Sequence, residues 1–181
     1  MSTRVVVHRT SEELQAGLEH VLASPKQGGE LQLIVRRPAN GERETLTVGE
    51  LNPLDGLRGD NWGARTAQPD PGAQLTIMSS RLVALIAVVP ERWALAGDQL
   101  YVDMDLGRDN LPPGTRLRIA DALLEVSSVP HHGCKKLAER FGVDAVRFIA
   151  SESTQPYRLR GINARVIEPG SVRVGDRLFK L

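Results

Sequence analysis

The sequence predicts a mainly β fold, most economically a closed barrel with helices across its ends. Two observations lead to this prediction. Short apolar or alternating runs recur along the chain and are separated by Pro, Gly, Asn and Asp. Only three segments carry the apolar spacing of a helix. A chain of 181 residues is long enough to bury the core of such a domain.

The first predicted element is a helix. Thr10 can cap the segment TSEELQAGLEHVLAS, and Glu13 reaches back to complete a capping box. Apolar residues then mark one face at helical spacing, namely Leu14, Leu18, Val21 and Leu22. Pro25 and the pair Gly28-Gly29 end the helix.

Turn residues predict the hairpins. The segment ELQLIVRR is expected to be a strand that turns back at residues 40–41, because Asn-Gly readily adopts the positive φ angles of a tight turn. Residues 115–129 form a second hairpin with its turn at residues 120–121. Residues 159–181 are expected to contain three more strands, separated by a Pro-Gly turn and a Gly-Asp turn.

Two shorter helices complete the prediction. One, capped by Ser79 or Ser80, is expected for SSRLVALIAVVPERW, and one that ends at Gly142 for GCKKLAERFG. Residues 52–74 contain many Pro, Gly, Asp and Asn residues and are long for a loop without structure. We therefore predict that this segment is a functional loop.

Composition narrows the class of protein. The chain has 23 Lys and Arg against 22 Asp and Glu, and the basic residues do not form a block. This balance predicts neither nucleic-acid binding nor attachment to a membrane surface. The longest apolar run, Leu82 to Val89, is eight residues, whereas about 20 span a bilayer. With a single cysteine and no signal-peptide pattern, we expect a soluble cytoplasmic protein.

Common catalytic motifs are missing from the sequence. It contains no phosphate-binding loop ending in Gly-Lys-Ser/Thr, no GxGxxG, no HExxH, no GxSxG and no CxxC pair. ATP hydrolysis by a P-loop, hydride transfer on a Rossmann fold and α/β-hydrolase chemistry therefore have no support.

The single cysteine, Cys134, allows two interpretations. Its predicted place at the start of a helix, beside Lys135, Lys136 and His132, favours a thiolate that acts as a nucleophile or a soft-metal ligand. Helical spacing equally places it on an apolar face with Leu137, Ala138 and Phe141. Local sequence alone leaves both interpretations open.

Other polar residues also have two interpretations. His131 and His132 are either metal ligands with Cys134 or solvated loop residues, and a structural zinc site requires about four spaced ligands. Asp60 ends a glycine-containing turn. Four arginines are candidates for an anion-binding rim, although strand ends often expose such residues: Arg36, Arg37, Arg58 and Arg65.

Five segments, taken in order, resemble the MOSC domain family, the C-terminal domain of molybdenum-cofactor sulfurases that also occurs as free-standing bacterial proteins. They are GLRGDNWGAR, LTIMSSRLVALIA, LAGDQLYVD, LPPGTRLRIADALLEVSSVPHHGCKKLAERFGVDAVRF and LRGINARVIEPGSVRVGD. The resemblance covers residues 30–181, so residues 1–29 are expected to be an N-terminal helical extension to this barrel domain.

The resemblance implies a β-barrel of the pyruvate-kinase barrel type. It also implies that Cys134 matches the family cysteine, which carries sulfur as a persulfide or contacts the metal of a molybdenum cofactor. Pyridoxal phosphate is not expected, because the chain has no room for a desulfurase domain. Two departures, GDQL in place of Gly-Glu-Asn-Leu and PHHGC ahead of the helix, point to a different ligand or to loss of cofactor binding.

Three hypotheses result. The chain is a sulfur carrier or molybdenum-cofactor-binding module that meets a small-molecule cofactor or a sulfur donor protein, with Cys134 as the reacting residue. Alternatively, it is a small molybdenum-dependent reductase of N-hydroxylated compounds that needs an external electron donor, or a degenerate barrel with a packing cysteine. The candidate cofactor-binding residues are Arg36, Arg58, Asp60, Asp98, Gln99, His131, His132 and Lys135.

Overall fold

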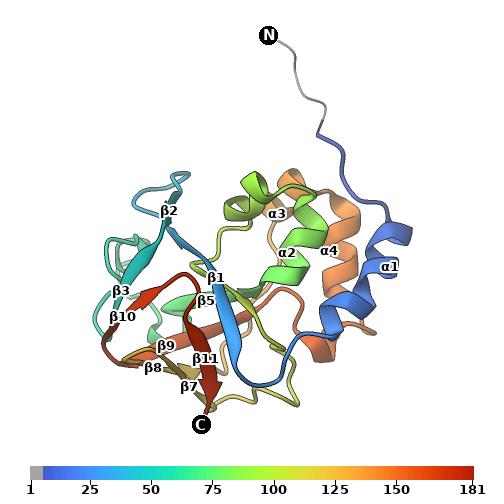
Figure 1. The fold of residues 1–181 in the computed structure, drawn as a ribbon. Coiled ribbons are helices and arrows are strands. Elements are labelled where there is room, and N and C mark those ends of the chain that lie inside the picture. Colours follow the sequence, from blue (N-terminus) through green and yellow to red (C-terminus); the bar gives the residue numbers. More distant parts are fainter. Residues whose placement is uncertain (1–5) are drawn as a thin grey trace.

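Seven short strands close into a barrel in the computed structural model, which describes residues 6–181 (Figure 1). The strands are β1 (Gly29–Arg36), β5 (Leu75–Ser79), β6 (Leu100–Asp103), β7 (Arg116–Ile119), β8 (Ala122–Val126), β9 (Ile162–Glu168) and β11 (Arg177–Lys180). They are hydrogen-bonded in the order β11-β7-β8-β9-β5-β6-β1, and pairing of β1 with β11 closes the ring. Only β5 and β6 run parallel. The predicted closed barrel is confirmed.

The predicted hairpins are also present. Strand β2 (Glu44–Leu46) pairs with the end of β1 across the Asn-Gly turn and extends the sheet beyond the ring. Strands β7 and β8 form the second hairpin, in which Ala120 adopts a φ of 46° at the turn. In the C-terminal segment, β9, β10 (Gly170–Arg173) and β11 are the three expected strands.

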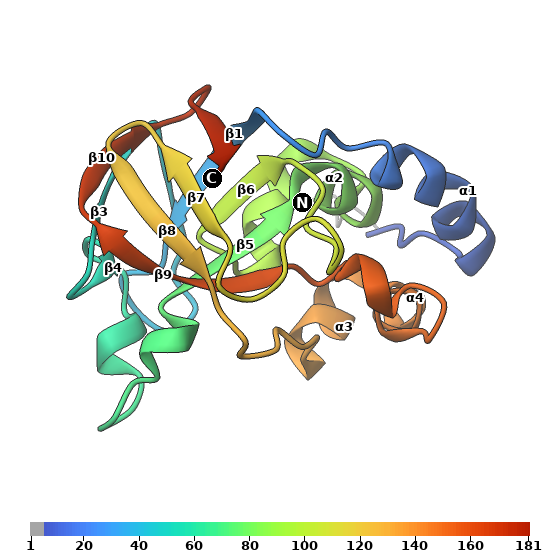
Figure 2. The ribbon, with the colours of Figure 1, turned by 90° about the horizontal axis from the view of Figure 1, so that it is seen from below.

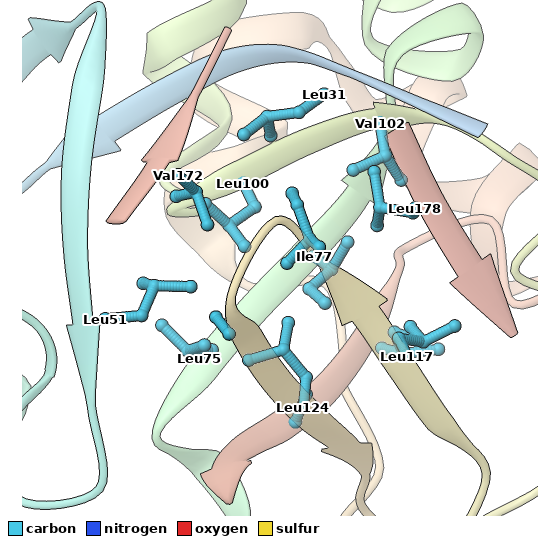
Figure 3. Close-up of a cluster of buried hydrophobic side chains, with 14 of the residues drawn as sticks. Leu31, Leu51, Leu75, Ile77, Leu100, Val102, Leu117, Leu124, Val172 and Leu178 are labelled. Atoms are coloured by element: carbon cyan, nitrogen blue, oxygen red, sulfur yellow. The ribbon is translucent and has the colours of Figure 1, made fainter. Parts of the chain in front are cut away.

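A second, three-stranded sheet packs against the barrel. It has the order β10-β3-β4, with β3 at Val48–Asn52 and β4 at Gly56–Leu57. Its apolar side chains Leu51 and Val172 belong to the same buried cluster as the barrel residues Ile77 and Leu124 (Figure 3). The barrel interior is therefore a packed core that extends to the second sheet.

A second core lies outside the ring. Successive side chains of a strand point to opposite faces. Ile77 and Leu100 therefore point into the barrel, whereas their neighbours Met78 and Tyr101 pack on its outside. The outward residues are covered by the helices on one side of the barrel (Figures 1 and 2). These helices are α1 (Ser11–Leu22), α2 (Ser80–Ala87), α3 (Lys135–Phe141) and α4 (Val143–Ala150).

Three of the helices match the sequence analysis. The capping box at Thr10 and Glu13 is present, and Ser79 caps α2 by accepting a hydrogen bond from the Leu82 N–H. Helix α1 packs on α2 and α4, with Leu14 fully buried. Helix α4 was not predicted, because a single residue, Gly142, separates it from α3.

The long segment 52–74 contains β4 and two short 3-10 helices, η1 (Trp62–Ala64) and η2 (Pro71–Ala73). Two further 3-10 helices are η3 (Pro90–Ala96) and η4 (Gln155–Tyr157). No helix within residues 6–181 combines the length and hydrophobicity required to cross a membrane.

Candidate functional site

A cleft of about 1000 Å³ opens beside the end of β1. Its walls are the turn between β1 and β2, the loop that contains η1 and η2, the turn at Gly97, the segment 129–134 and helix α3. Figure 2 shows this loop and α3 projecting from the same side of the barrel. Six basic residues line the cleft, against one carboxylate, Asp70, among the described residues: Arg37, Arg43, Arg65, Lys136, Arg140 and Arg160.

One of these arginines, Arg37, connects two segments of the cleft wall. Arg37 forms a buried ion pair with Asp60, at 2.7 Å between Nη2 and Oδ1, and its Nη1 donates to the Gly97 carbonyl at 3.0 Å. The same carboxylate accepts hydrogen bonds from the backbone N–H groups of Arg37 and Trp62. Asp60 therefore anchors the 58–62 turn to the end of β1 and has little capacity left for a ligand.

A second buried network lies behind segment 129–134. Asp98, fully buried, accepts from Arg160 Nη1 at 2.7 Å and lies 2.7 Å from His131 Nε2. Its backbone N–H donates to the Tyr101 hydroxyl. Burial alone would raise the pKa of Asp98, because it favours the neutral carboxyl. The charges and hydrogen bonds of Arg160 and His131 have a larger opposite effect, and the pKa of Asp98 is lowered to about 2. The carboxylate thus ties the segment before β9, through Arg160, to segment 129–134 and to the Gly97 turn, where Arg160 Nη2 donates to the Ala96 carbonyl.

The side chain of Gln99 is also hydrogen-bonded within the fold. Its Oε1 accepts from the backbone N–H and the hydroxyl of Thr76, at 2.7 Å and 2.6 Å, and its Nε2 donates to the Gln74 carbonyl. These bonds join the Gly97 turn to the start of β5. Asp98 and Gln99 therefore support the cleft from behind, and neither lines it.

Two other arginines converge without a carboxylate partner. A Cβ atom on Gly97 would lie 3.4 Å from Arg43 Nη2 and 3.9 Å from Arg140 Nη1, so both guanidinium groups lie over this glycine. Within residues 6–181 neither forms an ion pair, and the buried Nε of Arg43 has no hydrogen-bond partner. Burial, and then the charges of Arg140 and Arg37, lower the pKa of Arg43.

Arg65 adds a third positive charge to the same cleft. Its Nε donates to the Asn61 side chain at 2.9 Å, and burial followed by the charge of Arg37 lowers the pKa of Arg65. Among the described residues Arg43, Arg65 and Arg140 form no ion pair, and the nearby carboxylate of Asp60 is bonded to Arg37. This part of the cleft is therefore suited to an anionic ligand.

Cys134 borders this positive cleft. It is the residue before the first turn of α3 and its side chain is exposed, while Leu137 and Phe141 of the same helix are buried. The packing interpretation of Cys134 is therefore wrong, because the helix begins one residue later than the pattern indicates. The thiol and the unpaired arginines are open to the same space.

The other predicted residues fall into three groups. His131 and His132 line the cleft, although His131 is largely buried on Asp98 and is not a solvated loop residue. Asp60, Asp98 and Gln99 are buried behind it. Three predicted residues lie outside the cleft: Arg36, Arg58 and Lys135.

Each of these three exceptions has a physical reason. Arg36 is the last residue of β1 and Arg37 follows it, so the Arg36 side chain points away from that of Arg37 and pairs with Glu44. Arg58 follows β4 and does not reach the cleft. The side chain of Lys135 is 92% exposed and does not line the cleft, whereas its neighbour Lys136 does.

Arg43, Arg140 and Arg160 also line the cleft, although no local sequence signal marks them. Within residues 6–181, no three His, Cys, Asp or Glu side chains converge as they would around a metal ion held by the protein alone.

A sequence model of the MOSC domain matches residues 73–179, more than half of the chain. The chain belongs to the MOSC domain family. The matched region of this MOSC domain contains Cys134, Arg140 and Arg160, while Arg37 and Arg43 precede it.

Solved structures share the fold. The YuaD protein from Bacillus subtilis is 19% identical with a TM-score of 0.62, and the match covers 84% of this chain and 94% of that protein. YiiM from Escherichia coli is 23% identical with a TM-score of 0.53, covering 84% and 69%. YiiM from Geobacillus stearothermophilus is 15% identical with a TM-score of 0.57, covering 84% and 75%. A comparison with curated protein sequences finds no match for this MOSC domain.

Proposed function

We propose that this MOSC domain binds the molybdenum cofactor in the arginine-lined cleft and uses Cys134 as a sulfur carrier or as a ligand to molybdenum. The single observation that carries the proposal is an exposed thiol that shares one cleft with Arg43, Arg65 and Arg140, which form no ion pair with any residue from 6 to 181. Such a cleft suits a ligand with both an anionic group and a thiophilic centre.

The residues present fit this group. Molybdopterin carries a phosphate, which Arg43 and Arg140 would hold over Gly97, where the absence of a side chain leaves room. The volume of about 1000 Å³ is at the upper end for small-ligand sites. When bound, the cofactor would supply a metal centre with affinity for sulfur. The Cys134 thiol borders that space. Asp98 holds His131, and with it the segment that precedes Cys134.

Sulfur transfer to this chain needs only a persulfide donor. The Cys134 thiolate would attack the outer sulfur of a donor persulfide, forming a new S–S bond on Cys134 while the donor S–S bond breaks. The donor then leaves as a thiolate, and the transferred sulfur keeps its proton. No net oxidation occurs, because the donor supplies sulfur already at the persulfide level.

Native Cys134 is expected to react rapidly with iodoacetamide, because its side chain is exposed and borders a positive cleft. Intact mass spectrometry reports this site alone, since the chain has one cysteine. Incubation with a small persulfide donor is expected to add one sulfur atom to the wild-type protein and none to C134S. A native alkylation rate far below that of the urea-unfolded chain would contradict an accessible thiol.

Cofactor binding tests the arginines. R140Q is expected to lower the affinity for molybdenum cofactor by about tenfold, because a charge-assisted bond to phosphate is removed. Retained cofactor is measured by its molybdenum content and by the fluorescence of the oxidised pterin. The matched control is R36Q, which also removes one positive charge, but from a residue that does not line the cleft. Equal retention by R140Q and R36Q would show that the cleft does not hold the phosphate.

A further inference from the structure

A second cavity, of about 470 Å³, adjoins the arginine-lined cleft. It lies between the loop after β6, the end of α4, η4 and the start of β9. Segment 129–132 and Arg160 line both spaces and so form part of the wall between them. Neither Cys134 nor any residue of α3 lines the second cavity, and the function proposed above does not use it.

The lining of this cavity is positively charged. It includes three arginines (Arg108, Arg158 and Arg160) and His131 and His132, whereas no Asp or Glu among residues 6–181 lines it. Arg160 is engaged by Asp98, but its buried Nε has no hydrogen-bond partner in the described part of the chain. The remaining two arginines, Arg108 and Arg158, form no ion pair with any described residue.

Arg158 is held in place at the edge of this cavity. Its backbone is left-handed, with a φ of 47°, and its Nη1 donates to the Leu111 carbonyl at 2.6 Å. Burial, and then the nearby charge of Arg108, lower the pKa of Arg158. An anion bound by the two guanidinium groups would remove their repulsion and supply the negative charge that no described residue provides.

We propose that this cavity binds a small organic molecule through a terminal oxyanion, a carboxylate or a phosphate, held by Arg108 and Arg158. The rest of the ligand would contact the apolar side chains of Ile149 and Leu159, which also line the space. The volume of about 470 Å³ lies within the range of small-molecule sites. Binding here is independent of the cofactor and of Cys134, because the residues that hold the oxyanion do not line the other cleft.

Hexanoate and butyl phosphate are the probes, with neutral hexanamide as the isosteric control, in a two-dimensional NMR titration of the full chain. Saturable shifts are expected at residues 149–150 and 158–162 with at least one anion and not with the amide. If only one of the two anions binds, the result shows whether the site takes a carboxylate or a phosphate. Saturation by neither anion, or equal binding of the amide, overturns the proposal.

Matched variants assign the site. R108Q and R158Q are expected to weaken anion binding about tenfold, because each removes a charge-assisted bond. R118Q removes a charge from the exposed face of β7, and R140Q removes one from the other cleft, so both should bind normally. R108Q alters an exposed residue and keeps the test valid if R158Q fails to fold. Loss of binding in R140Q with retention in R108Q would place the anion in the cofactor cleft and refute this second site.

Discussion

Replacement of Asp98 by Asn is expected to lower the free energy of unfolding by about 3–5 kcal/mol, because it leaves a buried guanidinium without its counter-charge. Asp98 has no exposed surface, and the Arg160 side chain is 8% exposed. Because so little of the guanidinium is exposed, water replaces the lost carboxylate only in part. The Asn side chain retains the volume, so the loss reports the charge rather than a cavity.

The same pair gives a pH dependence of stability. The pKa of Asp98 falls from its ordinary value of 3.8 to about 2 in the folded protein. Above about pH 4 the carboxylate is charged in both states, and its contribution, about 2 kcal/mol, is present in full. It is lost as the pH falls towards about 2, where the folded protein takes up the proton.

Urea unfolding of the wild type and D98N across this pH range measures both effects. The difference in unfolding free energy is expected to be constant above about pH 4 and to narrow at lower pH. E44Q serves as the control, because it breaks the partly exposed pair with Arg36 and should cost less than about 1 kcal/mol. A D98N difference as small as that of E44Q would mean that Arg160 finds another partner.

The barrel could be predicted because its elements are specified locally. The Asn-Gly turn, the capping box at Thr10 and the serine cap of α2 each depend on residues close together in the sequence. Helix α4 was missed for a local reason as well. Gly142 adopts a φ of 93° and serves both as the end of α3 and as the residue before α4, so the two helices resemble one interrupted pattern.

The candidate site could be predicted only where its residues are neighbours in sequence. Cys134 and His131 belong to one segment, and sequence analysis placed both at a site. Asp98 is 62 residues from Arg160, and nothing in either segment indicates that they pair. A single sequence shows a carboxylate in a turn but not which charge it faces. Asp98 and Gln99 were therefore assigned to the ligand, although in the structure they support the walls.

Closure of the barrel explains the arginines that were missed. Arg43 follows β1, and Arg140 lies in α3, nearly a hundred residues later. Arg43 reaches Gly97 because β1 pairs with β6 shortly after that turn. Arg140 reaches it because α3 packs on η3, where Arg140 Nη1 donates to the Leu95 carbonyl. Neither position has a sequence pattern that differs from an ordinary exposed arginine. The positive cleft is thus a property of the tertiary arrangement of strands and helices, which propensity and spacing do not encode.

Replacement of Gly161 by Ala is expected to destabilise the protein by more than about 4 kcal/mol or to prevent folding, because strain and a backbone clash coincide. Gly161 has a φ of 104°, and a Cβ atom there would lie 2.2 Å from the Ile77 carbonyl oxygen. That carbonyl belongs to β5, which pairs with β9 at Ile77 and Ile162. Relief of the clash would therefore separate two strands of the ring and move the adjacent Arg160.

Gly114 provides the matched control for this substitution. It has a φ of 88°, but no atom lies within 4 Å of a Cβ built there. G114A should therefore cost only the left-handed backbone strain, about 1–2 kcal/mol. Urea unfolding of both variants separates the two contributions. Similar losses would mean that β5 and β9 adjust freely. A much larger loss in G161A would show that their close approach fixes Arg160, and with it the wall shared by the two cavities.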